Sequence, residues 1–169
     1  MRRVPIVGLA AAALLFVLDQ LAKLGVTRGI ALDEFTPPYR ITGFFNLRLV
    51  ANHGVSLGLF QADSHGARLF LIALTGAIAV AVAVWMARER NRIDQAALGL
   101  ILGGAIGNIL DRVRLGYVVD YADFHLGEWR PFLVFNLADA AISIGVILLL
   151  VRALLMRDKP PRATENSHA

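Results

Sequence analysis

The sequence predicts an all-α membrane protein, with four transmembrane helices and a small extracytoplasmic β-sheet and loop region. Two observations support this prediction. Hydrophobic residues make up 57% of the 169-residue chain and charged residues only 18%, whereas ordinary soluble chains have about 45–50% and about 25%. The charges are also missing from long runs such as Leu69–Ala87, and a membrane helix needs about 20 mainly apolar residues.

Four such runs divide the chain. Val4–Leu18, Leu69–Ala87 and Gln95–Leu110 contain no charged residue, and Pro131–Val151 contains only Asp139. If a few polar residues lie near one end of each span, these runs predict one integral membrane domain over residues 1–169. Its expected helices cover about 5–25, 68–87, 95–114 and 134–153, its extracytoplasmic loops about 26–67 and 115–133, and its cytoplasmic tail 154–169.

The basic residues predict the orientation of the chain. They are densest near both termini and in Arg88-Glu89-Arg90-Asn91-Arg92, so the positive-inside rule places these segments in the cytoplasm. Arg2 and Arg3 before an apolar run could also belong to a cleaved signal peptide. However, that run ends in Leu18-Asp19-Gln20-Leu21 without the small residues of a cleavage site. We therefore expect an uncleaved anchor.

The two long loops contain strand-like sequence. Thr36-Pro37-Pro38 stops any helix, and after it Tyr39–Thr42 and Asn46–Val50 alternate polar with apolar residues. Tyr117–Tyr121 in the second loop is a similar run. Alternation with a period of two predicts half-buried strands, so we expect a small sheet outside the membrane.

Residue content excludes several kinds of chemistry. The chain has no cysteine, so it has no disulfide, no thiolate nucleophile and no cysteine-based metal centre. His53, His65, His125 and His168 show no metal-ligand spacing, and we expect no metal and no cofactor. The net charge of +4 suits either nucleic acid or the edges of a membrane. The predicted spans favour the membrane, so no nucleic-acid partner is expected.

Polar residues inside the predicted spans gather at one depth. The first and third helices run outward and the fourth runs inward, so each set lies near the outer end of its helix. The first helix contributes Asp19, Gln20 and Lys23, the third Asn108, Asp111 and Arg112, and the fourth Asn136 and Asp139. Ionisable residues within a membrane are costly and indicate a functional site by default. We therefore expect a site beneath the outer loops.

Each of these groups also has a purely structural explanation. Asp19 and Lys23 are four residues apart and can form a helix-stabilising ion pair. Asp111 could pair with an arginine simply to neutralise its charge in the membrane. Asn136 and Asp139 have the spacing of a helix N-cap and its third-position carboxylate.

The glycines of the third helix predict close helix packing. Gly99, Gly103 and Gly107 are four residues apart, which places them on one face and lets a second membrane helix approach. Gly104, Asn108 and Asp111 are expected to line a neighbouring face.

Asp120 has no such structural explanation, because it lies in a strand-like run with no helix to cap. Together with Asp139 it gives two acids near one interface. Two close carboxylates cannot both ionise easily and so share a proton. One then acts as a base that activates water and the other as an acid, which is the chemistry of aspartic proteases.

These residues resemble the lipoprotein signal peptidase, or signal peptidase II, family of bacterial membrane aspartic peptidases. The similarity extends from residue 19 to about 145. It rests on five motifs in family-like order and spacing: Asp19-Gln20-x-x-Lys23, Asn52-His53-Gly54-Val55-Ser56, the glycine-rich block 103–112, Val118-Val119-Asp120-Tyr121 and Phe135-Asn136-Leu137-Ala138-Asp139. Leu57 replaces a commoner phenylalanine after Ser56, a departure that affects loop packing and touches neither aspartate, and Tyr121 in place of the frequent phenylalanine is a mild change.

The resemblance implies a substrate, a site and a location. The substrate would be a prolipoprotein whose lipobox cysteine already carries diacylglycerol, cleaved just before that cysteine to release the signal peptide. Asp120 and Asp139 would be the catalytic dyad. The supporting and substrate-binding residues would be Asn52, Gly54, Asn108, Asp111, Arg112, Asn136, Asp19 and Lys23. We expect a monomer in contact with membrane lipid, in the bacterial cytoplasmic (inner) membrane, with cytoplasmic termini and an outward-facing site.

The main alternative is a small proton-coupled transporter or channel subunit that uses Asp19, Asp111 and Asp139 as relay carboxylates. It predicts polar residues spread through the membrane depth, whereas here they cluster at one end. Within the peptidase hypothesis, Asp139 is expected at the start of the fourth helix, where the helix dipole favours a carboxylate. The shared proton is therefore expected mainly near Asp120, unless Arg112 lies against Asp120.

Overall fold

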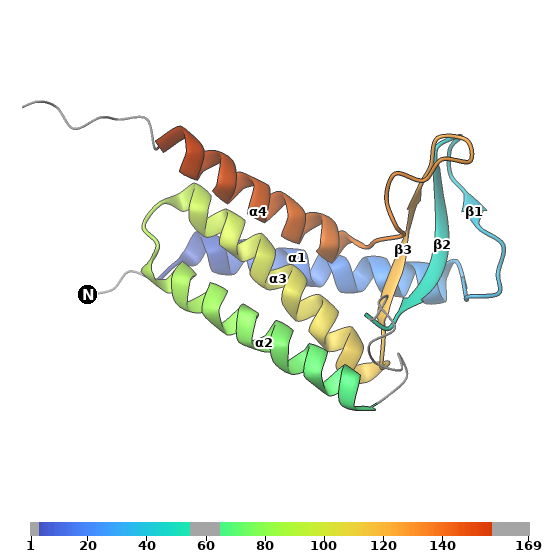
Figure 1. The fold of residues 1–169 in the computed structure, drawn as a ribbon, viewed down its shortest axis with the longest axis horizontal. Coiled ribbons are helices and arrows are strands. Elements are labelled where there is room, and N and C mark those ends of the chain that lie inside the picture. The colour runs from blue at the N-terminus through green and yellow to red at the C-terminus, as the bar shows by residue number, and fades with distance from the viewer. Residues whose placement is uncertain (1–3, 55–64, 157–169) are drawn as a thin grey trace, which may run out of the picture.

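A computed structural model describes residues 4–54 and 65–156. Four long helices form the body of the molecule and a small sheet lies at one end of them (Figure 1). The helices are α1 (Ile6–Leu24), α2 (His65–Arg88), α3 (Arg92–Arg114) and α4 (Leu137–Met156). Each is long and apolar enough to cross a membrane, so the predicted fold class is confirmed for the described residues.

The sheet is antiparallel and has the strand order β1-β2-β3. Its strands are β1 (Tyr39–Arg40), β2 (Phe45–Asn52) and β3 (Val118–Phe124). All three predicted strand-like runs therefore contribute strands. In the register of β2 and β3, Val50 is opposite Asp120 and Asn52 is opposite Val118. Residues 52 and 120, which lie far apart in the sequence, are thereby brought to one end of the sheet.

Helix boundaries differ from the prediction at several positions, and hydrogen bonds explain the starts of the third and fourth helices. α1 ends at Leu24, one residue from its predicted end near 25, and a π-helical segment η1 (Gly25–Gly29) continues it. The third begins at Arg92 rather than 95, because the side chain of Asn91 accepts from the N–H groups of Ile93 (2.8 Å) and Asp94 (3.3 Å). This is an N-cap, and it fixes where the helix starts.

The fourth helix begins at Leu137 rather than 134. Phe135 is held in an extended bridge to Ala122 of β3, donating to and accepting from that residue's backbone. The chain therefore cannot turn into a helix until after Asn136. The second helix is described from His65, three residues before its expected start, and ends at Arg88.

α3 is the central helix, and α1, α2 and α4 all pack against it (Figure 1). The predicted glycine face contacts α1: a Cβ on Gly103 would lie 2.5 Å from an α1 carbonyl oxygen, and Gly99 and Gly107 are similarly close to that helix. Gly104 faces α4 instead, where a Cβ would lie 2.7 Å from a carbonyl oxygen. Such approaches leave no room for a side chain, so the predicted packing role of these glycines is confirmed.

A small apolar core joins the sheet to the helices. Val26 of η1 and Leu32 pack with Leu49 of β2 and with Val119 and Tyr121 of β3. This core fixes β3 against the end of α1, which places Asp120 next to the polar ends of α3 and α4.

Candidate active site

The polar residues predicted to share one depth come together at the sheet-side end of the bundle. Hydrogen bonds and ion pairs connect side chains from α1, α3, α4, β2 and β3. Most of these side chains are removed from solvent: Asp19 and Asn136 are 0% exposed and Asp120 is 2% exposed. They form two clusters of different chemistry.

The first cluster is centred on Lys23, and we call it the Lys23 cluster: Asp19, Gln20, Lys23 and Asp111. The Lys23 ammonium lies 2.8 Å from a carboxylate oxygen of Asp19 and 2.8 Å from one of Asp111. Gln20 donates to the other oxygen of Asp111 (3.2 Å). The expected ion pair of Asp19 with Lys23 is confirmed. An Asp111–arginine ion pair is not, because the α1–α3 contact gives Asp111 a lysine as its partner.

The Lys23 cluster also ties the helices to the sheet. Asp19 accepts from the backbone N–H of Ala138 in the first turn of α4 (3.1 Å). Asp111 accepts from the N–H of Val119, the residue before Asp120 (3.2 Å). Asp19 thus pairs a backbone donor in the first turn of α4, and Asp111 holds the backbone of β3. These contacts hold α1, α3, α4 and β3 in a fixed arrangement.

The second cluster contains Asp120 and Asp139, which are bound by amides rather than by cations. Asp120 accepts from the side-chain amides of Asn52 (2.9 Å) and Asn136 (2.7 Å). Asp139 accepts from the amide of Asn108 (2.9 Å) and from the backbone N–H of Asn136 (3.2 Å). Among the described residues, no ion pair is made with either carboxylate. We call Asp120 and Asp139 the amide-bound pair.

Asn136 links the two carboxylates of this pair. Its side-chain oxygen accepts from the N–H of Asp139 (2.9 Å), so Asn136 is the N-cap of α4 and forms a capping box with Asp139. The predicted helix start is confirmed at these two residues. Because the oxygen of the Asn136 amide faces the helix, its NH₂ group faces Asp120 and Asn108.

Asn108 connects the Lys23 cluster to the amide-bound pair. Its side-chain oxygen accepts from the Lys23 ammonium (3.1 Å) and from the Asn136 amide (3.2 Å). With its oxygen occupied by two donors, its NH₂ group is directed to Asp139. The amide orientation that serves Asp139 is therefore fixed from the Lys23 side.

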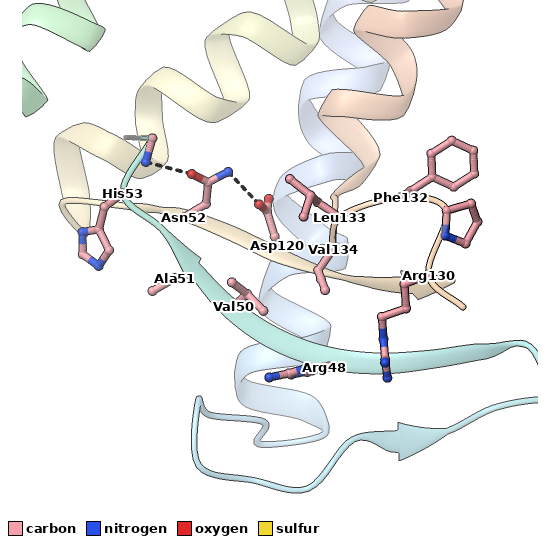
Figure 2. A pocket seen from close by; sticks show the side chains of 12 residues that line it. Arg48, Val50, Ala51, Asn52, His53, Asp120, Arg130, Phe132, Leu133 and Val134 are labelled. Atoms are coloured by element: carbon pink, nitrogen blue, oxygen red, sulfur yellow. Dashed lines mark hydrogen bonds between the residues drawn. The ribbon is translucent and has the colours of Figure 1, made fainter. Parts of the chain in front are cut away.

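Gly54 orients Asn52 on the opposite side of Asp120. The N–H of Gly54 donates to the side-chain oxygen of Asn52 (2.8 Å), so the NH₂ group of Asn52 points to Asp120 (Figure 2). Gly54 has φ +82°, and a Cβ there would lie 2.7 Å from Leu71 and 3.4 Å from the Arg112 guanidinium. Only glycine suits this position. The rest of the predicted motif, Val55 and Ser56, lies outside the described residues, as does Leu57.

Arg112 lies between the two clusters and is half-buried. Its guanidinium is beside Gly54, and its charge interacts most strongly with Asp139, then with Asp120 and Asp111. Arg112 therefore does not favour Asp120 over Asp139.

The pKa of Asp120 is raised from 3.8 to about 6. Burial is the main cause, because it disfavours the charged carboxylate. The hydrogen bonds from Asn52 and Asn136 lower the pKa, and the charge of Asp139 raises it. Asp120 is thus a carboxyl group that changes its protonation state close to neutral pH.

Asp120 lines an open cavity of about 680 Å³ on one face of the sheet, which we call the sheet-face cavity. Residues 48 and 50–54 of β2 and its end form one side, and the loop 130–134 forms the other. Figure 2 shows the Asn52 amide and the Asp120 carboxylate together on β2 and β3, with Phe132 and Leu133 across from them. Phe132 and Leu133 are exposed, so they form an apolar part of this side, next to Arg130.

Two arginines of this cavity were not predicted from the sequence. Arg48 on β2 and Arg130 in the second loop line it, and Arg130 is paired with the buried Asp123 (3.1 Å). Both are surface-type residues outside any motif, and the only sequence signal is that Arg48 precedes Asn52 by four residues in a predicted strand. Among residues 4–54 and 65–156, no group of three or more His, Cys, Asp or Glu side chains could hold a metal ion.

The fold and the site define a multi-pass membrane protein with a pair of amide-bound carboxylates at one end of its helices, one of them open to a cavity. The family model for signal peptidase (SPase) II matches residues 11–155. The chain is 51% identical to a protein named lipoprotein signal peptidase from Rhizorhabdus wittichii, over 96% of this chain and 93% of the relative. It is also 51% identical to one from Sphingopyxis alaskensis, over 92% and 90%.

Solved structures are similar to this chain as well. Two that are described as bacterial membrane enzymes superpose with a TM-score of 0.75 each. One is 25% identical and covers 89% of both chains, and the other is 28% identical and covers 90% of this chain and 94% of its own. The chain belongs to the signal peptidase II family of membrane aspartic peptidases. The comparisons give no support to the transporter alternative.

Proposed function

We propose that Asp120 and Asp139 are the catalytic dyad of this peptidase and that it removes the signal peptide from diacylglyceryl-modified prolipoproteins. The curated relatives are named for lipoprotein signal peptide removal. The observation that carries the residue assignment is the amide-bound pair itself. Asp120 and Asp139 are coupled through Asn136, have no cation partner among the described residues, and one of them faces the sheet-face cavity.

We further propose that Asp120 is the neutral acid of the resting dyad and Asp139 the ionised base. The raised pKa of Asp120 supports a proton there near pH 6. The first-turn position of Asp139 and the charge of Arg112 support an ionised partner. The pair is a coupled system, so a titration would report values that belong to both groups.

The proposed reaction is general acid–base hydrolysis. Asp139 accepts a proton from a water molecule as its oxygen attacks the scissile carbonyl carbon, while Asp120 hydrogen-bonds the carbonyl oxygen and transfers its proton to it. The tetrahedral diol then collapses. The C–N bond breaks, the amine leaves with the proton held by Asp139, and Asp120 recovers its proton from a diol hydroxyl.

The other predicted residues then act on this pair. Asn52, Asn136 and Asn108 orient the carboxyl groups through the contacts above, and Gly54 holds the Asn52 amide. Asp19, Lys23 and Asp111 hold the ends of α1, α3 and α4 together. Arg112 supplies a positive charge near Asp139.

The cavity suits a peptide that is anchored in the membrane by lipid. Its polar side holds Asp120 and Asn52, and its apolar part is formed by Phe132 and Leu133 next to the start of α4. A cysteine that carries two acyl chains can leave those chains between the helices in lipid while the peptide bond before it reaches Asp120. Cleavage just before that cysteine follows from this placement.

The test uses the purified protein and a prolipoprotein with or without diacylglycerol on its cysteine. We expect the lipidated substrate to be shortened to a product that begins at the modified cysteine. The unlipidated substrate should be cut poorly, because it lacks the anchor. Equal rates on both would remove this role for the lipid, and no cleavage of either would refute the proposed activity.

We propose that the sheet-side end faces outward from the cytoplasmic membrane and that both chain termini are cytoplasmic. A cysteine placed at the exposed Phe35 should react with an impermeant thiol reagent in intact cells, and one at Asn91 should not. The chain has no other cysteine, so each signal reports one site. Labelling at Asn91 but not at Phe35 would reverse the orientation. Ser64 and Asn166, two further positions suited to this test, lie outside the described residues.

The position of the shared proton can be tested by infrared titration of the resting enzyme. The neutral-carboxyl band near pH 6 should vanish in Asp120→Asn. In Asp139→Asn it should vanish or move to much lower pH, because Asp120 then faces no second charge. A band that survives unchanged in Asp120→Asn would place the proton on Asp139.

A further inference from the structure

A second cavity lies behind the catalytic end, at the junction of α1, α3 and β3. It has a volume of about 160 Å³ and shares no lining residue with the sheet-face cavity. We call it the α1–α3 cavity. Its lining residues are Gln20, Lys23, Leu24, Thr27, Arg28, Asp111, Arg114, Leu115, Tyr117 and Val119.

Two arginines in this cavity have no partner among the described residues. Neither Arg28 nor Arg114 makes an ion pair there, and no hydrogen bond of their guanidinium groups is found within residues 4–54 and 65–156. Lys23 and Asp111, which also line the cavity, are already paired with each other at 2.8 Å. Asp19 also pairs with Lys23. The three cations Lys23, Arg28 and Arg114 still exceed the two carboxylates Asp111 and Asp19, so the cavity has a net positive charge.

The cavity lies at the ends of two membrane-spanning helices, where we expect phospholipid headgroups. Arg28 is next to the end of the apolar stretch Ile6–Gly29, and Arg114 is the last residue of α3. The C-terminal ends of α1 with η1 and of α3 lie at the end of the bundle that bears the sheet (Figure 1). Tyr117, at the same level, adds a phenol group of the kind that is enriched where a membrane meets water.

Two exposed leucines border the arginines in this cavity. Leu24 is 40% exposed and Leu115 is 48% exposed, although both are leucines at helix ends. A positively charged cavity bordered by exposed leucines at the ends of two membrane helices matches a lipid with an anionic headgroup and acyl chains. Guanidinium groups are well suited to the oxygens of a phosphate diester.

We propose that the α1–α3 cavity binds the phosphate headgroup of an anionic phospholipid in the leaflet on the sheet side, with Arg28 and Arg114 as its ligands. Tyr117 also lines the cavity and carries a phenol hydroxyl, whereas the hydroxyl of Thr27 already donates to the Lys23 carbonyl (2.8 Å). The cavity favours an anionic lipid over a lipid with an amine headgroup, because Arg28 and Arg114 carry uncompensated positive charge and the carboxylate of Asp111 is already paired with Lys23. The site is separate from the reaction centre, and the proposal does not depend on the proposed activity.

The experiment compares the full-length protein with Arg28→Gln/Arg114→Gln in nanodiscs of phosphatidylcholine that contain some phosphatidylglycerol. Lipid retained on the released protein is measured by native mass spectrometry. We expect the wild type to retain phosphatidylglycerol over phosphatidylcholine. The double variant should bind phosphatidylglycerol about ten- to a hundredfold more weakly, because it lacks two charge-assisted contacts.

The matched control is Arg40→Gln/Arg90→Gln, which removes the same charge from two exposed positions outside the cavity. It should retain phosphatidylglycerol like the wild type. Equal loss in both double variants would mean that only overall charge matters and would overturn the proposal. So would undiminished retention in Arg28→Gln/Arg114→Gln, or displacement of the lipid by inorganic phosphate at moderate concentration.

Discussion

Each of the two polar clusters at the sheet-side end contains two aspartates, but the groups that bind those aspartates differ in charge. In the Lys23 cluster one ammonium compensates Asp19 and Asp111 at 2.8 Å from each. In the amide-bound pair, the donors to Asp120 and Asp139 found within residues 4–54 and 65–156 are uncharged amides and a backbone N–H. The pair that is compensated by a cation holds helices together, whereas the amide-bound pair is the one that we propose to share a proton.

This difference follows from what each donor can do. A buried charge is costly unless an opposite charge is close, and Lys23 meets that need for two carboxylates at once. Asparagine amides satisfy the oxygens of a carboxyl group without cancelling its charge. Burial therefore still acts on Asp120, whose pKa rises to about 6. Asn108 contacts both clusters and transmits the geometry of one to the other.

The largest expected effect is the loss of turnover when either aspartate of the amide-bound pair is replaced. Asp120→Asn and Asp139→Asn should each lower cleavage by about a thousandfold or more, because the two carboxyl groups act as one acid–base unit. For the same reason the double variant should be scarcely slower than either single variant. Initial rates on a diacylated prolipoprotein measure this.

The matched control for these variants is Asp94→Asn, the same substitution in an ion pair with Arg152 at the other end of the bundle. It should cleave like the wild type. Both dyad variants should elute as folded monodisperse protein. Wild-type-like cleavage by either variant would contradict the assignment of Asp120 and Asp139 as the catalytic dyad.

The next effect is on stability in the Lys23 cluster. Lys23→Met leaves Asp19 and Asp111 buried without a cation and should cost about 3–5 kcal/mol of unfolding free energy. Adding Asp111→Asn should recover part of this loss, since one uncompensated charge is then removed. Thermal unfolding in detergent measures both.

Arg152→Met serves as the comparison for Lys23→Met, because it breaks the partly exposed pair with Asp94. It should cost no more than about 1 kcal/mol. If Lys23→Met and Arg152→Met lower the unfolding free energy equally, Lys23 does not compensate two buried carboxylates as proposed.

A smaller effect is expected at Asn108, the link between the clusters. Asn108→Ala removes one hydrogen-bond donor from Asp139. It should reduce kcat about ten- to a hundredfold, because a hydrogen bond to a charged group contributes about that factor. Asn91→Ala, which removes the N-cap of α3 at the opposite end, should lower stability by about 1 kcal/mol and leave kcat unchanged. A normal kcat in Asn108→Ala would show that Asp139 does not need this link.

The smallest effect is a shift in the pH profile. Catalysis by a neutral Asp120 is lost as pH rises through its pKa of about 6. The hydrogen bond from Asn52 lowers that pKa, so Asn52→Ala should raise it and move the alkaline limb of kcat/KM upward by about one unit. Asn46→Ala on the same strand should leave the limb in place. A downward shift in Asn52→Ala would assign the limb to another group.

The four spans and the depth of the polar residues could be predicted from the sequence. Charge-free runs and the positive-inside rule need no tertiary contact, because the bilayer itself selects them. The glycine face of α3 and the capping box of Asn136 with Asp139 are local patterns, and both are present. The helix ends were less predictable, since η1 and the Phe135 bridge depend on the sheet.

Only the tertiary structure decided which acid has which partner. Lys23 can reach Asp19 within its own helix, but its second partner, Asp111, lies 88 residues away and is brought there by the α1–α3 contact. The register of β2 and β3 likewise brings Asn52 to Asp120. The sequence by itself determined that acids and amides would meet at one depth. Which of them would be compensated by a cation depended on how the glycine-rich helix packs, and that is a long-range property.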